Sequence, residues 1–293
     1  MPMEKPTSRP TCPMIDYIIG PFQYSFMQRA LIVSVLVGFL LPMVGAYIIT
    51  RGRAFMTDAL AHSLVVPVAV AFLLGLTTYL IAVPGGVAIA LLMGYLGRHT
   101  GISDDTSIGV VFAGMFALGL IILSVSADIT PGRVPPIEDL LLGQILSVTR
   151  MDVIVSLILT VGVAVGIYLF HRHLVFTTFD PVGARVVGFK TSVVEYLLLA
   201  LLALVIVIGL SAAGIVLVMA MLVIPSASAY LLARRFTGMI LIGAAIGVVS
   251  AVTGLYLSYH ADWPSGPAMA LVATVIFGAA TLHKRTFPVR SDE

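Results

Sequence analysis

The chain has 293 residues, of which 59% are hydrophobic and only 10% charged, and its mean hydropathy is +1.10. This composition excludes an ordinary soluble domain and is typical of proteins whose helices cross a bilayer several times. The formal net charge of +2 is too small, and the basic residues too scattered, to indicate nucleic-acid binding. Because Cys12 is the only cysteine, an intrachain disulfide and a thiolate metal cluster are both excluded.

Apolar runs bounded by charges, Pro and Gly predict an all-α polytopic membrane protein with about nine transmembrane helices, within a range of about eight to ten. Some runs are short and are separated only by Pro84-Gly85-Gly86 or Ala213-Gly214, which is why the range is wide. The expected helices cover residues 29–50, 57–78, 80–97, 107–127, 151–170, 194–211, 213–232, 237–258 and 266–283.

The ends of the chain differ from this apolar body. Residues 1–13 are polar and Pro-rich and lack the basic-then-apolar order of a signal peptide, so we expect an extracytoplasmic tail. Residues 14–28 are expected to lie at the membrane interface, or alternatively to form a tenth helix. Residues 29–286 then form a single transmembrane domain, and residues 287–293 form a cytoplasmic tail.

Basic residues gather on one side of the expected spans. By the positive-inside rule this side is the cytoplasm, and an odd number of spans places the N-terminus outside and the C-terminus inside. The residues that decide the orientation are Arg51, Arg53, Arg98, Arg172, Arg185, Lys190, Arg234, Arg235, Lys284 and Arg285.

Two connecting segments are long enough to hold short helices of their own. On the outer side, residues 137–148 have Glu138 and Asp139 in a first helical turn, where carboxylates complement the helix dipole. On the inner side, Asp180-Pro181 predicts the start of a helix over about 178–188, because Asp is a favoured cap and Pro a favoured first residue. The alternative for 178–188 is a loop resting on lipid headgroups.

The most informative pair is Asp58 and His62, at the start of the second expected span. A spacing of four places the carboxylate and the imidazole on one helix face, one turn apart. Ionisable groups inside a bilayer are costly and usually line a pathway, and an Asp oxygen with a neutral His nitrogen suits Mn²⁺, Zn²⁺ or Fe²⁺. The alternative is structural, with Asp58 capping the helix and His62 bonding a neighbouring carbonyl.

Weaker candidates lie elsewhere in the chain. Glu195, at the cytoplasmic start of the sixth span, either approaches the path or lies at headgroup level near Lys190. The outer His260 and Asp262 either meet the incoming ion or belong to an ordinary interfacial turn. A helix of small residues is interrupted by Pro225 followed by Ser226, and we expect this segment to hinge and to gate the path.

Several catalytic motifs are missing from the sequence. There is no G-x-x-x-x-G-K-[ST], no H-E-x-x-H and no G-x-S-x-G. The chain therefore lacks a P-loop of its own and the usual parts of a zinc protease or a serine hydrolase. We expect no catalytic residues, and any ATP dependence must come from another subunit.

Six segments resemble, in order and over some two hundred residues, those of the manganese/zinc/iron permeases of bacterial ABC importers. They are Phe55 to His62, Asp104 to Val111, Leu141 to Leu146, Phe179-Asp180 with Ala184 to Gly188, Met219 to Ala229, and Leu257-Ser-Tyr with Pro264-Ser-Gly266.

The resemblance implies a type II-like permease in the bacterial plasma membrane that imports Mn²⁺, Zn²⁺ or Fe²⁺ and holds no tightly bound cofactor. Its partners would be a second permease chain, expected to be an identical copy, a cytoplasmic ATPase dimer that binds ATP, and an extracytoplasmic metal-binding protein. Asp58 and His62 would be path-lining metal contacts. Residues 137–148 would lie beneath the binding protein. Coupling to the ATPase would involve Phe179, Asp180, Ala184 and Gly188.

Two alternatives stay open at this point. In one, the chain is a proton-coupled secondary transporter that uses the Asp58/His62 pair as a proton relay and needs no ATPase. In the other, it is an assembly or sensing subunit, and the pair is structural.

Overall fold

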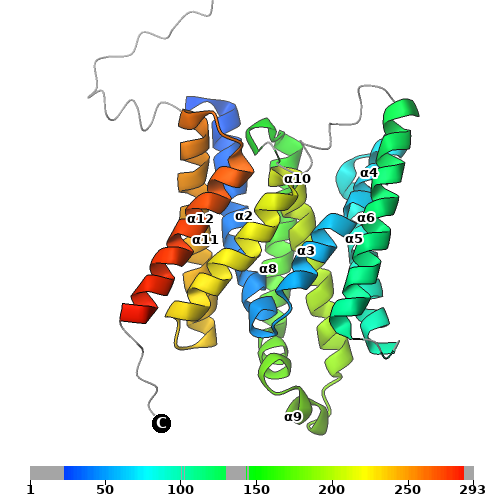
Figure 1. The fold of residues 1–293 in the computed structure, drawn as a ribbon, viewed down its shortest axis with the longest axis vertical. Coiled ribbons are helices and arrows are strands. Elements are labelled where there is room, and N and C mark those ends of the chain that lie inside the picture. Colours follow the sequence, from blue (N-terminus) through cyan, green and yellow to red (C-terminus); the bar gives the residue numbers. More distant parts are fainter. Residues whose placement is uncertain (1–22, 100, 102, 130–142, 144, 287–293) are drawn as a thin grey trace, which may run out of the picture.

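A computed structural model describes residues 23–99, 101, 103–129, 143 and 145–286, and over these ranges the chain is a bundle of helices (Figure 1). Nine helices in this part of the chain are long and apolar enough to cross a membrane, as the sequence predicts. The elements are α2 (Ser25–Thr50), α3 (Ala54–Ser63), α4 (Val65–Leu74), α5 (Thr78–His99), α6 (Asp104–Ile129), η2 (Ile145–Ser147), α8 (Arg150–Phe179), α9 (Pro181–Val186), α10 (Thr191–Leu232), α11 (Phe236–Ala261) and α12 (Ser265–Thr286).

The expected helix over 137–148 falls mostly outside the described residues. Its described end forms the single 3₁₀ turn η2, in which Ile145 is fully buried and its backbone N–H donates to Ser265 Oγ at 3.3 Å. The expected tails, apart from residues 23–28, also lie outside the described ranges. Residues 25–28 belong to α2, which therefore begins four residues before the expected start at 29.

The second expected span consists of two helices, α3 and α4, with a break at Leu64. Pro67 lies in the first turn of α4, where its missing N–H is tolerated. The span ends at Leu74 rather than at 78, because Gly75 adopts φ 66° and ψ 24°, a left-handed conformation that terminates helices.

The helix α10 contains the sixth and seventh spans. Gly214 separates them with φ 78° and ψ 170°, a conformation essentially restricted to glycine. The sequence boundary at Ala213-Gly214 is therefore correct, and its physical cause is the backbone freedom of one residue. The spans on either side are Thr191–Ser211 and Gly214–Leu232.

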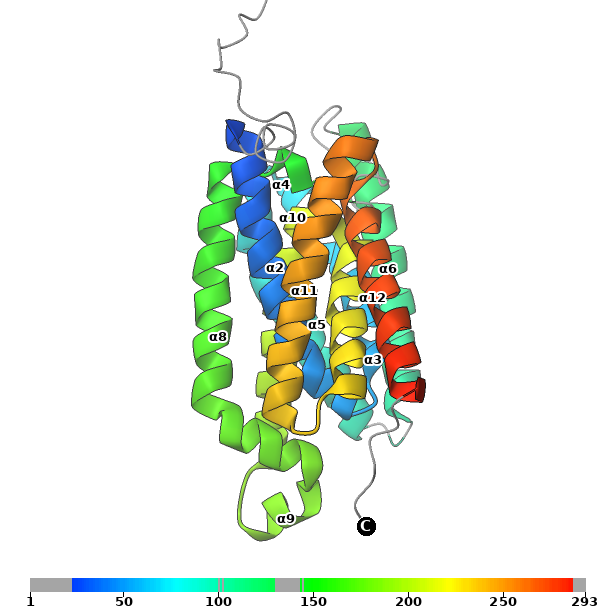
Figure 2. The ribbon, with the colours of Figure 1, turned by 90° about the vertical axis from the view of Figure 1, so that its left-hand side faces the viewer.

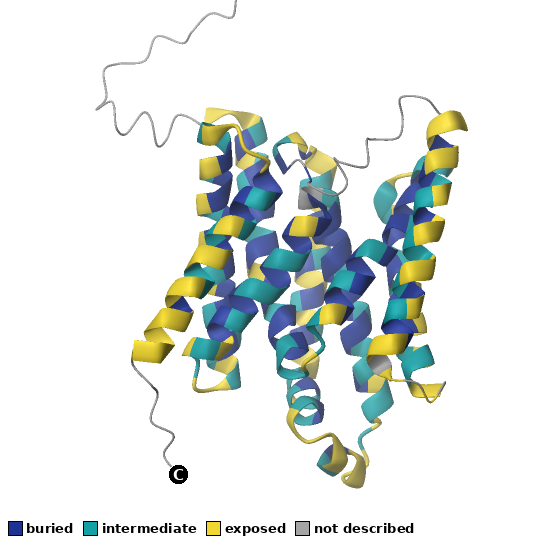
Figure 3. Ribbon diagram, viewed as in Figure 1, coloured by how far each residue is buried: buried dark blue, intermediate teal, exposed yellow. Residues whose placement is uncertain are grey.

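The centre of the bundle is formed by α2 and the first half of α10, whereas α6 and α8 lie at the periphery, with only 22% of the apolar span of each buried (Figure 3). Small residues bring α2 close to its neighbours. A Cβ on Gly38 would lie 2.7 Å from the Gly247 carbonyl oxygen of α11, and a Cβ on Gly45 would lie 2.1 Å from the Leu222 carbonyl oxygen of α10. These close approaches are typical of helix packing in membranes, where van der Waals contact drives association.

The helix α8 continues nine residues beyond the expected end of its span at residue 170, and its last turns bend beneath the bundle, with α9 below them (Figure 2). Its last turns are tied to the end of α2. Arg51 donates from Nε to Thr178 Oγ1 at 3.0 Å and from Nη2 to Thr177 Oγ1 at 3.2 Å. Tyr47 and His171 also form a hydrogen bond, with 2.7 Å between the hydroxyl and Nδ1. Burial lowers the pKa of Arg51 from its ordinary value, which reflects how closely this joint is packed.

Candidate metal site

Asp58 and His62 both lie on α3, one turn apart. The helix begins at Ala54 with Arg53 as its N-cap residue, so Asp58 is the fifth helical residue and does not cap the helix. The capping alternative for Asp58 is therefore wrong. The two side chains are partly buried, with 24% of Asp58 and 23% of His62 exposed.

His62 Nδ1 faces both polar groups of Asp58. It lies 3.0 Å from the Asp58 carbonyl oxygen, in hydrogen-bond geometry, and 2.9 Å from the carboxylate Oδ1. The hydrogen bond to the carbonyl is the one that the structural alternative anticipated for His62. It also selects a tautomer, because an Nδ1–H that donates to an oxygen leaves a lone pair on Nε2.

The imidazole ring of His62 meets two aromatic rings of α6 edge to face. The ring centroids are 5.6 Å from Phe112 and 5.4 Å from Phe116, with interplanar angles of 75° and 84°. These contacts orient the ring and exclude water from one side of it. Metal-binding histidines commonly donate one ring N–H to a carbonyl or carboxylate while the other nitrogen coordinates the ion, and His62 has this arrangement.

One chain offers few ligands at this place. Among the described residues, no group of three or more His, Cys, Asp or Glu side chains is close enough to hold a metal ion. The pair can hold a cation only weakly unless further donors come from outside the chain or from the ion's own water.

The segment expected to contact an ATPase is organised around Asp180. Asp180 is the N-cap of α9, and its Oδ1 accepts a hydrogen bond from the Gly183 backbone N–H at 2.7 Å. Pro181 occupies the first helical position, as the sequence predicts. The helix is shorter than the expected 178–188, since Thr178 and Phe179 belong to α8 and Gly188 lies in the following turn with φ 92°.

The surface of α9 is exposed and largely apolar, apart from the exposed Arg185 and one buried anchor. Ala184 is fully buried, whereas Val182, Val186 and Val187 are 65%, 83% and 67% exposed. Phe179 points to a different neighbour, because its ring packs edge to face on Phe236 at 5.4 Å. Apolar side chains that project from the end of a molecule are typical of a contact surface.

Ser226, in the expected gate, is fully buried and bridges two helices. Its Oγ lies 3.0 Å from the Pro42 carbonyl oxygen of α2 and 2.7 Å from the Leu222 carbonyl oxygen of its own helix. Pro225 precedes it inside α10, facing a stretch of α2 that also contains a proline. Two helices with interrupted hydrogen-bond ladders therefore meet here.

The outer candidates form the turn between α11 and α12. His260 Nδ1 lies 3.0 Å from the Tyr256 carbonyl oxygen, and its ring contacts the Tyr256 ring with 4.2 Å between centroids and an interplanar angle of 39°. Asp262 ends α11 in a left-handed conformation with φ 52°. Ser258 Oγ donates to the Trp263 carbonyl oxygen at 2.7 Å and closes the turn. The structure does not bring these residues together with Asp58 and His62.

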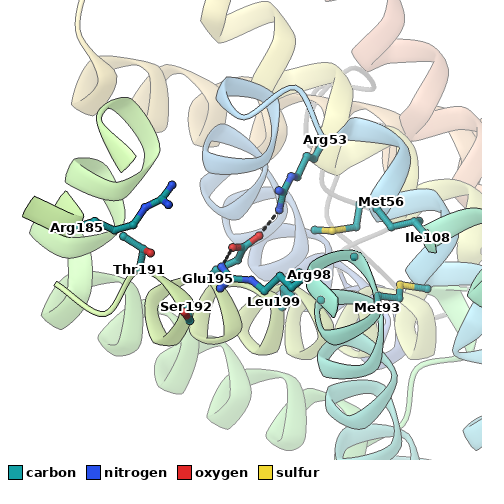
Figure 4. Close-up of a pocket in the computed structure, with 12 residues that line it drawn as sticks. Arg53, Met56, Met93, Arg98, Ile108, Arg185, Thr191, Ser192, Glu195 and Leu199 are labelled. Carbon is teal, nitrogen blue, oxygen red and sulfur yellow. Dashed lines mark hydrogen bonds and ion pairs between the residues drawn. The ribbon is translucent and has the colours of Figure 1, made fainter. Parts of the chain in front are cut away.

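Glu195 lies in the first turns of α10, where its carboxylate bridges two arginines. One oxygen contacts Arg53 Nη1 and the other contacts Arg98 Nη2, at the end of α5 (Figure 4). The sequence predicted that Glu195 approaches the path or lies at headgroup level near Lys190, and it did not predict the contacts with Arg53 and Arg98. The available signal was that Arg53, Arg98 and Glu195 share one end of the expected spans, but the sequence does not say which loops are neighbours.

Comparisons with known proteins agree with this architecture. Residues 23–284 match the profile of the ABC 3 transport family. The manganese transport system membrane protein MntC of Listeria monocytogenes is 39% identical over 266 residues, which cover 91% of this chain and 93% of that protein. The chelated iron transport system membrane protein YfeD of Yersinia pestis is 31% identical over 278 residues, covering 94% and 92%.

A solved structure has the same fold. The chain in the structure of PsaBC from Streptococcus pneumoniae in complex with Fab superposes with a TM-score of 0.81 at 31% identity, covering 91% of this chain and 95% of that one.

Proposed function

The chain belongs to the ABC 3 transport family, and from this premise we propose that it is the permease subunit of an ATP-driven importer whose cargo is divalent manganese. The observation that carries the proposal is the match over nine tenths of its length to a manganese transport membrane protein, together with an Asp/His pair in a membrane helix. Fe²⁺ and Zn²⁺ suit the same donors, so they are the competing cargoes. ATP hydrolysis takes place on a separate chain.

The metal station consists of Asp58 and His62. His62 Nε2 presents its lone pair to the ion while Nδ1 is held by Asp58, and the second carboxylate oxygen of Asp58 supplies a hard donor. Two permease copies would contribute two such pairs around a shared axis, enough for binding that is weak enough to release the ion. We take the second copy to be identical.

The two ends of the bundle have different partners. The end that carries α9 also carries the basic loops, so it faces the cytoplasm, and the N-terminus is then outside (Figure 1). The exposed valines of α9 dock into the ATPase dimer, positioned by the Asp180 cap and by buried Ala184. An extracytoplasmic metal-binding protein delivers the ion to the opposite end, near His260 and Asp262.

The gate lies where α2 meets the second half of α10. The hydrogen bond between Ser226 Oγ and the Pro42 carbonyl joins α2 to α10. Each helix contains a proline there and so lacks one backbone N–H donor, which lets both helices bend at this contact without breaking a regular set of backbone hydrogen bonds. When ATP draws the α9 helices together, this contact opens the path. Cross-linking the Pro225 segment across the dimer axis should stop transport and leave the complex assembled, whereas unaffected transport would contradict the gating role.

The decisive experiment is metal uptake into proteoliposomes that contain the permease, its ATPase and its binding protein. We expect ATP-dependent manganese uptake that Asp58→Asn and His62→Ala abolish while the complex still assembles. Uptake by both variants at the wild-type rate would refute the metal station. Uptake by the permease alone, without an ATPase, would identify a secondary transporter instead.

A further inference from the structure

The Arg53–Glu195–Arg98 cluster joins three helices at the end of the bundle that carries α9. Glu195 comes from the start of α10, Arg53 caps α3, and Arg98 lies in the last turn of α5. All three side chains are mostly shielded from solvent, with 19% of Glu195, 28% of Arg53 and 30% of Arg98 exposed. Such pairs are held more firmly than exposed ion pairs, since removing one partner leaves a shielded charge uncompensated.

One side of the cluster leads to α9 through a stiff joint. Only four residues separate the end of α9 from the start of α10, and backbone hydrogen bonds span them. The Phe189 N–H donates to the Ala184 carbonyl at 2.9 Å, and the Gly188 N–H donates to the Arg185 carbonyl at 3.0 Å. A displacement of α9 therefore moves the first two turns of α10, and Glu195 lies in the second of these.

The other side of the cluster leads to the metal pair. Arg53 is five residues before Asp58, and the intervening turn is continuous helix, with the Met56 N–H donating to the Arg53 carbonyl at 3.1 Å. A short helix moves as one body, and α3 continues into α4 through the backbone hydrogen bonds at Leu64. A pull on Arg53 thus shifts Asp58 and His62 together.

We propose that Glu195 is a positioning residue of the transport cycle, which transmits the movement of α9 through Arg53 to the helix that holds Asp58 and His62. This inference rests on the proposed function. Arg98 ties the end of α5 to the same part of α10, because its guanidinium contacts Glu195 and also lies over the neighbouring Tyr196 ring, 5.5 Å from the centroid. Binding of the ATPase to α9 thereby changes the geometry offered to the ion.

The cavity beside the cluster is consistent with a mechanical role rather than a path for the ion. It has a volume of about 330 Å³ and is lined by Arg53, Arg98, Arg185 and Glu195, together with uncharged residues (Figure 4). Three guanidinium groups against one carboxylate repel a divalent cation. The space leaves room for the side chains to shift when α9 moves.

The test compares Glu195→Gln with the complete wild-type transporter in proteoliposomes, with manganese uptake and phosphate release measured on the same sample. The matched control is Asp105→Asn, which makes the same change at an exposed carboxylate at the start of α6, on the same end of the bundle. We expect Glu195→Gln to lower manganese transported per ATP hydrolysed by about fivefold to 150-fold, the range typical of coupling between two sites. The ATPase rate and the control should stay at wild-type values.

A double-mutant cycle identifies the route. If coupling runs through the Glu195–Arg53 contact, Arg53→Gln has the same effect as Glu195→Gln, and the double variant is no worse than either single one. An unchanged ratio of manganese to ATP in Glu195→Gln would overturn the inference. A parallel fall of uptake and ATPase activity would also overturn it, because the residue would then serve assembly alone.

A second readout does not depend on the cargo. In a Cys12→Ser background, spin labels at the exposed Phe55 of α3 and Leu282 of α12 report whether α3 moves when a non-hydrolysable ATP analogue binds the complex. We expect a change in label distance in the wild type that Glu195→Gln abolishes. Movement of α3 that persists in Glu195→Gln refutes the inference, whether or not the wild-type complex transports manganese. A wild-type complex that transports no manganese counts against the proposed function instead.

Discussion

Replacing Gly45 with alanine should force apart the two helices at the centre of the bundle. A Cβ at this position would lie 2.1 Å from the Leu222 carbonyl oxygen and 2.4 Å from Ser226 Oγ. The nearer obstacle is backbone, so a rotamer change cannot relieve the clash. The helices must separate, and the contact between Ser226 and the Pro42 carbonyl, now 3.0 Å, is lost with the close packing.

The expected loss of stability has two sources, the overpacked contact and the lost hydrogen bond between α2 and α10. Overpacking a tight contact costs about 1–3 kcal/mol, and an interhelical hydrogen bond in a membrane protein contributes about 0.6 kcal/mol. We expect Gly45→Ala to lower the free energy of unfolding by about 2–4 kcal/mol in total. The matched control is Gly278→Ala in α12, where a Cβ would meet nothing within 4 Å. Since alanine is the better helix former, the control should be neutral or more stable by about 0.5–1 kcal/mol.

The measurement is equilibrium unfolding of the purified permease in mixed micelles with an increasing fraction of sodium dodecyl sulfate, followed by circular dichroism. Gly45→Ala should unfold at a clearly lower fraction of denaturing detergent than the wild type, and Gly278→Ala at the same or a higher fraction. Equal midpoints for the two alanine variants would refute the argument that backbone contact at Gly45 holds α2 and α10 together.

Three further predictions address other joints of the fold. Asp180→Ala should destabilise α9 by about 1 kcal/mol through loss of the cap and should reduce copurification of the ATPase. Asp180→Asn retains a capping oxygen and should behave as wild type. Equal losses of copurification in both variants would contradict the capping role. Gly214→Ala should cost about 1–3 kcal/mol, because alanine is strained at φ 78°, and a thermal midpoint unchanged from wild type would argue against that backbone conformation. Tyr47→Phe should cost about 1 kcal/mol by removing the hydrogen bond to His171, an effect that should vanish in a His171→Ala background if the 2.7 Å contact is its source.

The spans were predictable because a bilayer requires long apolar helices whose backbone groups are satisfied internally, and this requirement leaves a strong mark on the sequence. Local chemistry was also predictable. The Asp180-Pro181 helix start and the break at Gly214 each depend on a residue and its immediate neighbours. The end of α8 was placed nine residues too early, because hydropathy records where the membrane ends and a helix can continue beyond it in water.

The environment of Asp58 and His62 shows what the sequence could not predict. The spacing of Asp58 and His62 predicts that they share a helix face, and they do. Whether Asp58 caps its helix depends on where the helix begins, and in the structure the helix begins at Ala54, four residues before Asp58. The aromatic rings of Phe112 and Phe116 that contact His62 belong to a helix some fifty residues away in the chain, and no sequence pattern near His62 predicts this contact.

The sequence by itself determined the class of the molecule, the nine spans found in the described part of the chain, and the shared helix face of Asp58 and His62, because hydrophobic thickness, turn chemistry and helix periodicity are local properties. Only the tertiary structure decided which helices touch. The bridge from Glu195 to Arg53 and Arg98 joins residues about one hundred or more positions apart, and contacts of this kind depend on how small residues let helices approach. The connection between α9 and the Asp58/His62 pair is therefore a property of the packed bundle.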